Sequence, residues 1–426
     1  MAILTHLLGA AFAFAAPPAN FTPNPSVGPS QGSIRFKDSP HFRIYNPTSD
    51  SIASGTISYL EAAYSCFVDD LHWRSPGLSF RPDPLPAVDS IPANQFYKLN
   101  VYQLDSLPGA AANTPTDLNL GLAWLNVQKD YMSNPAVVVH EFGHALTYAA
   151  KYWIDQTRTG AWWETVANFV ADTYSTSTHC AAARKRYNQP EGNSLIELNK
   201  VISDSFQVIV DGTRDSGNYY QAWPFLAYMH NNPDNYPGLG TSIFPAVWTQ
   251  YKKNSDETPL HVLDRLLGSG TRIQTVVAKY WARMAFVDIG NPKAQALFNS
   301  QRSRLNYANL DNLGGGRYRV KSGRRPRYMG ANIIPLKATP GNVSVKITGN
   351  TGPLTSTLVV KTADGKSVRY VDLPGGNGQT NLLNGEEAML VVVNTPNNLA
   401  LFDPFKLTAE TNTGVNYEVQ LTGATA

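Results

Sequence analysis

The chain is short of charge, and this shortage narrows what it can do. Only 16% of its 426 residues are charged, and 35 Lys and Arg nearly balance 32 Asp and Glu, which leaves a net charge of +3. Such a balance gives no basic surface of the kind that binds nucleic acid, so we expect no nucleic-acid partner. After the first residues, no apolar run approaches the roughly 20 residues that cross a membrane. We therefore expect no membrane span.

Cysteine is equally scarce, with only Cys66 and Cys180 in the whole chain. Two cysteines fit one disulfide in an oxidising compartment, and two buried free thiols are the alternative. A disulfide would join the helix expected around residues 57–71 to the region after a helix expected over 161–175. The pairing would then close a long loop and stabilise the fold.

The N-terminus has the composition of an exported chain. Residues 1–15 form a short apolar stretch that ends in Ala13-Phe14-Ala15, which fits the A-x-A cleavage site of a signal peptide. The stretch lacks the usual preceding Lys or Arg, so a short apolar strand is the alternative. Residues 16–32 are rich in Pro, Asn and Ser and are predicted to be a flexible N-terminus. We expect a secreted, extracellular protein.

What the chain does have is the motif His140-Glu141-Phe142-Gly143-His144. Residues four apart on a helix point the same way from successive turns, so His140 and His144 could hold one Zn²⁺ between them. Glu141 lies one step round the helix, where a general base would act beside a metal. Asn134-Pro135 is typical of a helix start, and valines and alanines give this helix an apolar face.

A second helix, expected from residue 161 to about 175, carries Glu164, twenty residues after His144. Glu164 is the third expected ligand, and three protein ligands leave one position of the metal open, as in catalytic zinc sites. Asn168 lies four residues later on the same face, where its side-chain oxygen could accept the spare ring N–H of a zinc-binding histidine. Ordinary histidines on a core helix are the alternative.

The motif at residues 140–144 together with Glu164 resembles the gluzincin branch of zinc metallopeptidases, whose best-known member is thermolysin. This resemblance implies that His140, His144 and Glu164 bind one catalytic Zn²⁺ and that Glu141 is the general base. The sequence departs from thermolysin-like enzymes at Asn168, where they have aspartate. An amide oxygen can still accept the hydrogen bond, but without the negative charge.

The resemblance implies two further parts of a peptidase site. The strand before the HExxH helix is a sheet edge that binds substrate backbone in gluzincins, which assigns this role to Ala123 and Trp124. A purely structural strand is the alternative. A His or Tyr from the later helices donates a hydrogen bond to the oxyanion. We favour Tyr228 and His230. The other candidates are Tyr219, Tyr220 and Tyr236.

The expected fold class is α+β with two domains. Residues 33–328 are predicted to form a zincin-like metallopeptidase domain with a small sheet, the HExxH helix and an α-rich lobe. Residues 329–426 contain short alternating strands between Gly, Asn and Pro turns and are predicted to form an all-β sandwich, similar to the C-terminal sandwiches of secreted peptidases. The basic run between residues 317 and 327 is expected to be a solvated linker.

These observations predict a secreted zinc-dependent endopeptidase that acts on a peptide or protein substrate. A non-enzymatic secreted binding protein on a degenerate metallopeptidase scaffold is the alternative, with the C-terminal sandwich binding a carbohydrate or surface polymer. An aminopeptidase is a third interpretation, although the GAMEN motif of aminopeptidases is missing.

Overall fold

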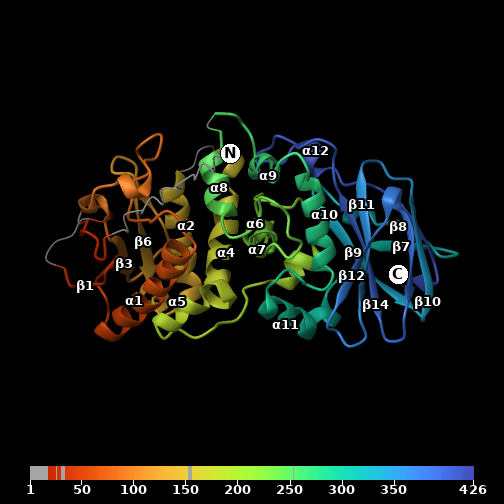
Figure 1. Ribbon diagram of the computed structural model, residues 1–426, viewed down its shortest axis with the longest axis horizontal. Helices are drawn as coiled ribbons and strands as arrows, with labels where there is room; N and C mark the ends of the chain where they lie inside the picture. Colours follow the sequence, from red (N-terminus) through yellow and green to blue (C-terminus); the bar gives the residue numbers. More distant parts are fainter. Residues whose placement is uncertain (1–17, 25, 30–33, 152–155, 253) are drawn as a thin grey trace, which may run out of the picture.

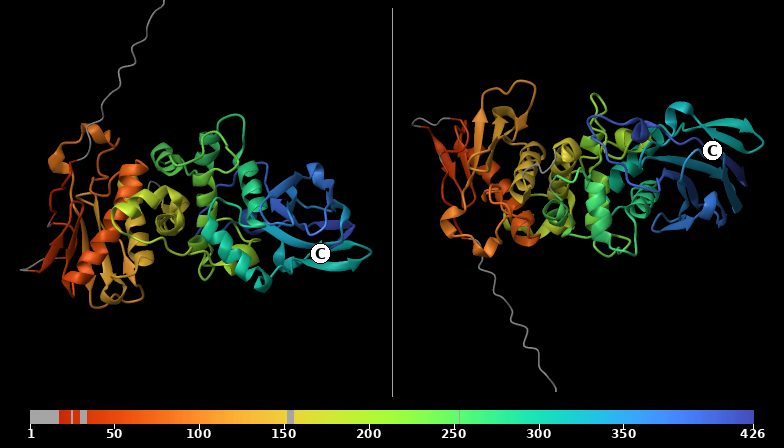
Figure 2. Two further views of the ribbon diagram at one scale, coloured as in Figure 1. Left: turned by 60° about the horizontal axis from the view of Figure 1, so that its bottom comes forward. Right: turned by 90° about the horizontal axis from the view of Figure 1, so that it is seen from above.

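Three regions lie in a row along the long axis of the molecule: a mixed sheet with two helices, a helical lobe and a β-sandwich (Figures 1 and 2). The computed structural model describes residues 18–24, 26–29, 34–151, 156–252 and 254–426. The signal peptide expected over residues 1–15 lies outside this part of the chain. None of the helices in the described ranges has the length and apolar character needed to cross a membrane. The mixed α+β composition and the β-rich C-terminal region agree with the α+β part of the expected fold class.

The first region is a sheet with the strand order β1–β2–β3–β6–β4, in which β5 also pairs with β6. Strands β2, β3 and β6 run parallel, whereas β1, β4 and β5 are antiparallel to their neighbours. The helices α1 and α2 pack against the sheet between it and the helical lobe (Figure 1). The bounds are β1 (Phe36–Asp38), β2 (Phe42–Tyr45), α1 (Asp50–Tyr64), β3 (Leu99–Leu104), β4 (Ala112–Asn113), β5 (Thr116–Asp117), β6 (Leu122–Gln128) and α2 (Pro135–Lys151).

The N-terminal segment is ordered where the structure describes it. Phe21 is buried and packs edge-on against His41, with ring centroids 4.8 Å apart. Thr22 forms a bridge with Tyr97, and the Tyr102 hydroxyl donates a hydrogen bond to the Val27 carbonyl at 2.6 Å. The prediction of a flexible N-terminus is therefore wrong for residues 18–24 and 26–29. The Pro and Ser content of this segment is typical of a mobile chain, but the buried side chain of Phe21 anchors it.

The helical lobe follows, and its helices lie close to where the apolar periodicity places them. The α-rich lobe expected after the HExxH helix is present, and the apolar pattern of residues 221–230, 244–252, 261–267 and 273–286 predicts helices in each of these places. A later helix, α11, was not predicted, because it buries only Ala294 and Phe298 and so has a weak apolar pattern. The bounds are α3 (Gln156–Thr159), α4 (Trp162–Thr176), α5 (Ala181–Arg186), α6 (Asn218–Gln221), α7 (Trp223–Asn231), α8 (Ile243–Gln250), α9 (Pro259–Leu267), α10 (Ile273–Met284) and α11 (Pro292–Gln301).

The C-terminal region is a sandwich of two antiparallel sheets, ordered β13–β10–β15–β8–β7 and β12–β11–β14–β9–β16. Apolar side chains from both sheets fill the space between them, as expected for a sandwich. The bounds are β7 (Leu310–Gly314), β8 (Arg317–Val320), β9 (Ala331–Ala338), β10 (Gly341–Thr348), β11 (Leu354–Lys361), β12 (Val368–Asp372), β13 (Asn377–Leu382), β14 (Glu387–Asn394), α12 (Ala409–Asn412), β15 (Glu418–Thr422) and β16 (Ala424–Thr425).

The sandwich begins earlier than predicted. Tyr318 and Val320 on β8 point into its core, while Arg319 on the opposite face forms an ion pair with Glu418 at 2.6 Å. The basic run is therefore partly a strand that alternates arginines with buried residues, and the predicted boundary at residues 328/329 is wrong. The many arginines of this stretch led to the prediction of a linker. The alternation of charged and apolar residues with a period of two is, however, typical of a strand.

The sandwich is also not a detached module. On β14, Leu390 and Val392 enter the sandwich core, whereas Met389 and Val391 join the large core shared with the rest of the molecule. This sheet is thus buried on both faces, which explains the unbroken apolar run on β14. One consequence is that the sandwich and the helical lobe form a continuous body (Figure 1).

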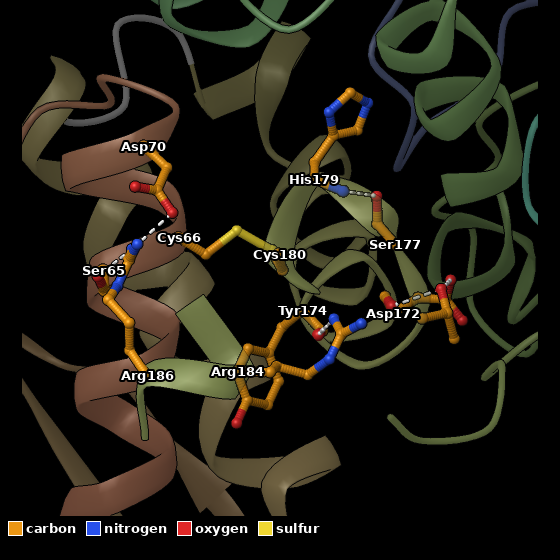
Figure 3. Close-up of a disulfide and its surroundings, with 11 residues drawn as sticks. Ser65, Cys66, Asp70, Asp172, Tyr174, Ser177, His179, Cys180, Arg184 and Arg186 are labelled. Carbon is orange, nitrogen blue, oxygen red and sulfur yellow. Dashed lines mark hydrogen bonds and ion pairs between the residues drawn. A yellow bond between two sulfur atoms is a disulfide. The ribbon is translucent and has the colours of Figure 1, made fainter. Parts of the chain in front are cut away.

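The two cysteines form the predicted disulfide, with their Cα atoms 5.0 Å apart (Figure 3). Cys66 lies in a π-helical turn that continues α1, and Cys180 lies in a 3-10 turn that follows α4. Close by, Arg186 donates hydrogen bonds to the Ser65 hydroxyl and the Asp70 carboxylate, each at 2.6 Å. The cross-link thus ties the first region of the molecule to the end of α4.

We expect replacement of both cysteines by serine to lower the free energy of unfolding substantially. The disulfide joins residues 114 positions apart, and the chain-entropy account gives about 4–5 kcal/mol for a loop of this length. Urea unfolding followed by circular dichroism measures the difference, with the disulfide-bonded protein under non-reducing conditions as reference. An unchanged unfolding midpoint would contradict the expectation.

Candidate metal centre

His140 and His144 lie on successive turns of α2, and Glu164 approaches them from the first turn of α4. The Oε2 atom of Glu164 is 3.0 Å from Nε2 of His140 and 3.5 Å from Nε2 of His144. The three ligand atoms lie within 4.8 Å of one another, and in the described part of the chain no other group of His, Cys, Asp or Glu is placed to hold a metal. The structure therefore brings the three predicted ligands together.

Gly143 allows the two helices to come this close. A Cβ atom at this position would lie 2.9 Å from Cα of Ala167 and 3.1 Å from Cβ of Val170. These distances are shorter than side chains tolerate, so glycine is required by packing and not by backbone conformation. The glycine inside the motif thus brings α4, and with it Glu164, up to the two histidines.

Asn168 determines the orientation of His140. Its Oδ1 is 2.7 Å from Nδ1 of His140, and its Nδ2 donates a hydrogen bond to the Tyr220 carbonyl at 2.6 Å. Because the Tyr220 carbonyl can only accept, the amide group must face it, and Oδ1 is left to accept from the Nδ1–H of His140. The Nε2 atom of His140 is thereby the ring nitrogen left to face Glu164, and it would present its lone pair to a cation once its proton is displaced. An aspartate at position 168 would leave the Tyr220 carbonyl without a donor, which explains why this chain has asparagine there.

The charges of the cluster suit a cation. Burial alone would raise the pKa of Glu164, but hydrogen bonds from His140 and His144 hold it well below its ordinary value. Burial alone would lower the pKa of His140, yet its hydrogen bond to the Glu164 carboxylate and the charge of Glu141 raise it. Two imidazole nitrogens and one carboxylate oxygen are the donor set of catalytic zinc sites, so these residues fit Zn²⁺.

Glu141 is outside the group of possible ligand atoms. Its carboxylate accepts a hydrogen bond from the Thr114 hydroxyl at 2.6 Å. Thr114 lies in the short connection between β4 and β5, and sequence reasoning missed it because an isolated threonine gives no signal. The hydroxyl orients the Glu141 carboxylate next to the edge of the sheet.

The predicted substrate strand is wrong, because β6 is not an edge. On one side Trp124 pairs with Asn100 of β3, and on the other Ala123 pairs with Thr116 of β5. Residues 112–117 fold back over β6 and make the outer edge themselves. Strands as short as β4 and β5 carry no periodicity that a sequence could reveal.

The two favoured oxyanion donors also lie elsewhere. The Tyr228 hydroxyl donates a hydrogen bond to Asp234 at 2.9 Å. His230 packs against His179, with ring centroids 4.8 Å apart, just beyond the C-terminal end of α4. Phe169 of α4 also packs edge-on against the His230 ring, with ring centroids 5.3 Å apart, and His230 is only 2% exposed. Burial lowers the pKa of His230 to about 3. Both predictions are wrong because α7 turns these side chains into the core.

A family model described as a family of unknown function, DUF6055, matches residues 46–426. The chain belongs to this family. No curated protein matches the chain. The family match covers the metal cluster and the whole sandwich, which agrees with the continuous body that these regions form.

Unlike Tyr228 and His230, Tyr220 lies beside the metal cluster. Its ring is stacked over His140, with centroids 6.4 Å apart, and is 39% exposed. Burial and the charge of Glu164 raise its pKa, so the phenol stays protonated and can donate. Tyr219 packs beside it with ring centroids 4.6 Å apart. The sequence names Tyr220 only as one of several candidate tyrosines. The fold is needed to tell which of these tyrosines lies near the histidines.

A residue of the C-terminal region also lies close to the metal cluster. Phe405 packs edge-on against Tyr219 with ring centroids 6.2 Å apart, and it remains 45% exposed. The Gly212 N–H donates a hydrogen bond to the Pro404 carbonyl at 3.0 Å, which fixes the segment in place. An aromatic surface therefore runs from His140 through Tyr220 and Tyr219 to Phe405.

Proposed function

We propose that this protein is a secreted zinc-dependent endopeptidase of the gluzincin type that hydrolyses peptide bonds in a peptide or protein. The observation that carries the proposal is the convergence of the His140 and His144 Nε2 atoms on Glu164, with Asn168 setting the tautomer of His140. Two His and one Glu leave room for a reacting group, unlike a closed structural site. The disulfide favours an oxidising compartment such as the cell exterior.

The residues of the site have separable tasks in this reaction. A bound Zn²⁺ would supply Lewis-acid polarisation of the scissile carbonyl and lower the pKa of a water. Glu141, oriented by Thr114, takes a proton from the attacking water and passes it to the leaving amine. Tyr220 donates its phenolic hydrogen to the oxyanion that forms. The edge made by β4 and β5 holds the substrate backbone in place of β6.

The proposal is tested by metal analysis together with digestion of a broad peptide library. We expect about one zinc per chain and cleavage within peptides that a chelator stops and added zinc restores. Bound zinc without cleavage of any peptide would favour the non-enzymatic binding protein, with the sandwich recognising a carbohydrate or surface polymer. Products trimmed only from the N-terminus would indicate an aminopeptidase.

We expect Tyr220→Phe to lower kcat by roughly 10²–10³-fold, because the variant keeps the ring but loses the oxyanion donor. Zinc content and KM should stay the same. Tyr228→Phe is the matched control, since this hydroxyl bonds to Asp234 in the core, and its kcat should equal that of the wild type. Equal kcat values for the two variants would remove Tyr220 from this role.

A further inference from the structure

A second candidate ligand site lies on the other side of the N-terminal sheet. A cavity of about 470 Å³ opens between the N-terminal segment, the loop over residues 74–97 and the start of β6. Leu125 on β6 belongs to the core beneath α2, whereas Leu122, three residues before it, lines the cavity. Side chains three apart on a strand point to opposite faces, so the sheet separates this cavity from the metal cluster. The volume is within the range of small-molecule sites.

Arg74 lines this cavity with a charge that no described acid neutralises. Within the described part of the chain, its guanidinium donates only to the carbonyls of Pro86 and Ser79, each at a long 3.3 Å. Its Nε is buried and has no partner among the described residues. Burial lowers the pKa of Arg74 to about 10, and no neighbouring acid acts against this effect. A half-buried cation held only by carbonyls is costly unless an anion joins it.

The N-terminal segment beside the cavity cannot supply that anion. Residues 1–33 contain neither Asp nor Glu, so the N-terminal segment that forms one wall carries no carboxylate. The first acid of the chain, Asp38, is already paired with Arg43 at 2.7 Å and lies near Lys98 at 3.6 Å. No acid among the described residues acts on the charge of Arg74, which leaves its guanidinium available to an anion from outside the chain.

We propose that this cavity binds a small amphipathic carboxylate, with its carboxylate group on Arg74 and its apolar part against Leu78, Ile91 and Leu122. The planar guanidinium offers two parallel N–H groups that match a carboxylate, which makes such a pair directional as well as charged. Leucine, isoleucine and proline side chains make up much of the remaining wall. A free organic acid and the C-terminus of a peptide share this chemistry.

Isothermal titration calorimetry with octanoate and N-acetyl-L-phenylalanine tests the proposal on the full chain and separates the two sources. At least one of them should bind at least tenfold more tightly than its matched primary amide and than inorganic phosphate. Octanoate alone would indicate a free organic acid, and N-acetyl-L-phenylalanine alone would indicate a peptide terminus. Failure of both to bind at millimolar concentration would overturn the site.

Substitutions at Arg74 give a second measurement that needs no peptidase activity. Arg74→Met keeps the apolar stem, so it should weaken carboxylate binding at least tenfold while the melting temperature without ligand stays equal or rises. Arg74→Lys keeps the charge but not the fork and should weaken binding less. Arg214→Met, at a side chain that is 96% exposed, should change neither quantity. Carboxylate binding that is unchanged in both Arg74 variants would show that Arg74 only braces the loop.

Discussion

Replacing Glu141 with glutamine is expected to abolish peptide hydrolysis while zinc remains bound. Glutamine has the shape of glutamate and can still accept the hydrogen bond from Thr114, but it cannot take a proton from water at neutral pH. Loss of a general base costs roughly 10²–10⁴-fold in rate. Zinc should stay, because Glu141 is outside the group of ligand atoms.

Two measurements on the same preparation check this expectation: zinc per chain by mass spectrometry, and kcat on a peptide that the wild type cleaves. Thr114→Val is the matched variant, since it leaves the carboxylate in place and removes only the hydroxyl that orients it. It should lose less activity than Glu141→Gln and keep its zinc. Hydrolysis at the wild-type rate by Glu141→Gln would mean that another group is the base, and loss of zinc would place Glu141 among the ligands.

The sequence predicted the parts of the site that depend on one helix at a time. A period of 3.6 residues placed His140 and His144 on one face of α2, and spacing alone placed Glu164 and Asn168 on one face of α4. The helix α2 begins at Pro135, where its start was expected, and α4 spans Trp162–Thr176, close to the expected range of residue 161 to about 175. Local geometry was sufficient here because each helix carries its own apolar pattern.

The parts that the sequence did not predict depend on long-range contacts. Tyr220 and Tyr228 are indistinguishable as residue types, and only the packing of α6 beside α4 brings Tyr220 to the histidines. The substrate edge was misplaced because β4 and β5 are each two residues long. Phe405 is far along the chain from the motif, and nothing in the local sequence shows that it packs against Tyr219.

Zinc affinity should fall as the residues of the cluster become protonated. In the metal-free protein, Glu164 and Glu141 raise the pKa of His140, so this imidazole holds its proton to a higher pH than an ordinary histidine. A metal must displace that proton before it can use the ring nitrogen. Affinity should therefore fall as the pH is lowered through the raised pKa of His140, and zinc binding should release protons over that range.

Replacing Glu164 with alanine is expected to release the metal. The substitution removes the only anionic ligand of the cluster and leaves two histidines, so affinity should fall by more than the roughly 10–100-fold that loss of an outer hydrogen-bond partner costs. Competition with a chromogenic chelator measures the affinity. Asn168→Ala supplies the comparison, because it removes the hydrogen bond to His140 but no ligand, and its loss should be the smaller one.

The pair of variants also separates a metal site from an ion-pair cluster. If the two histidines and Glu164 only stabilised the packing of α2 against α4, Glu164→Ala would lower the free energy of unfolding equally with and without zinc. In a metal site, added zinc stabilises the wild type by an amount that grows with its concentration, and this gain disappears in Glu164→Ala. Unchanged zinc stoichiometry in Glu164→Ala would exclude this residue as a ligand, and with it the three-ligand centre on which the proposed peptidase depends.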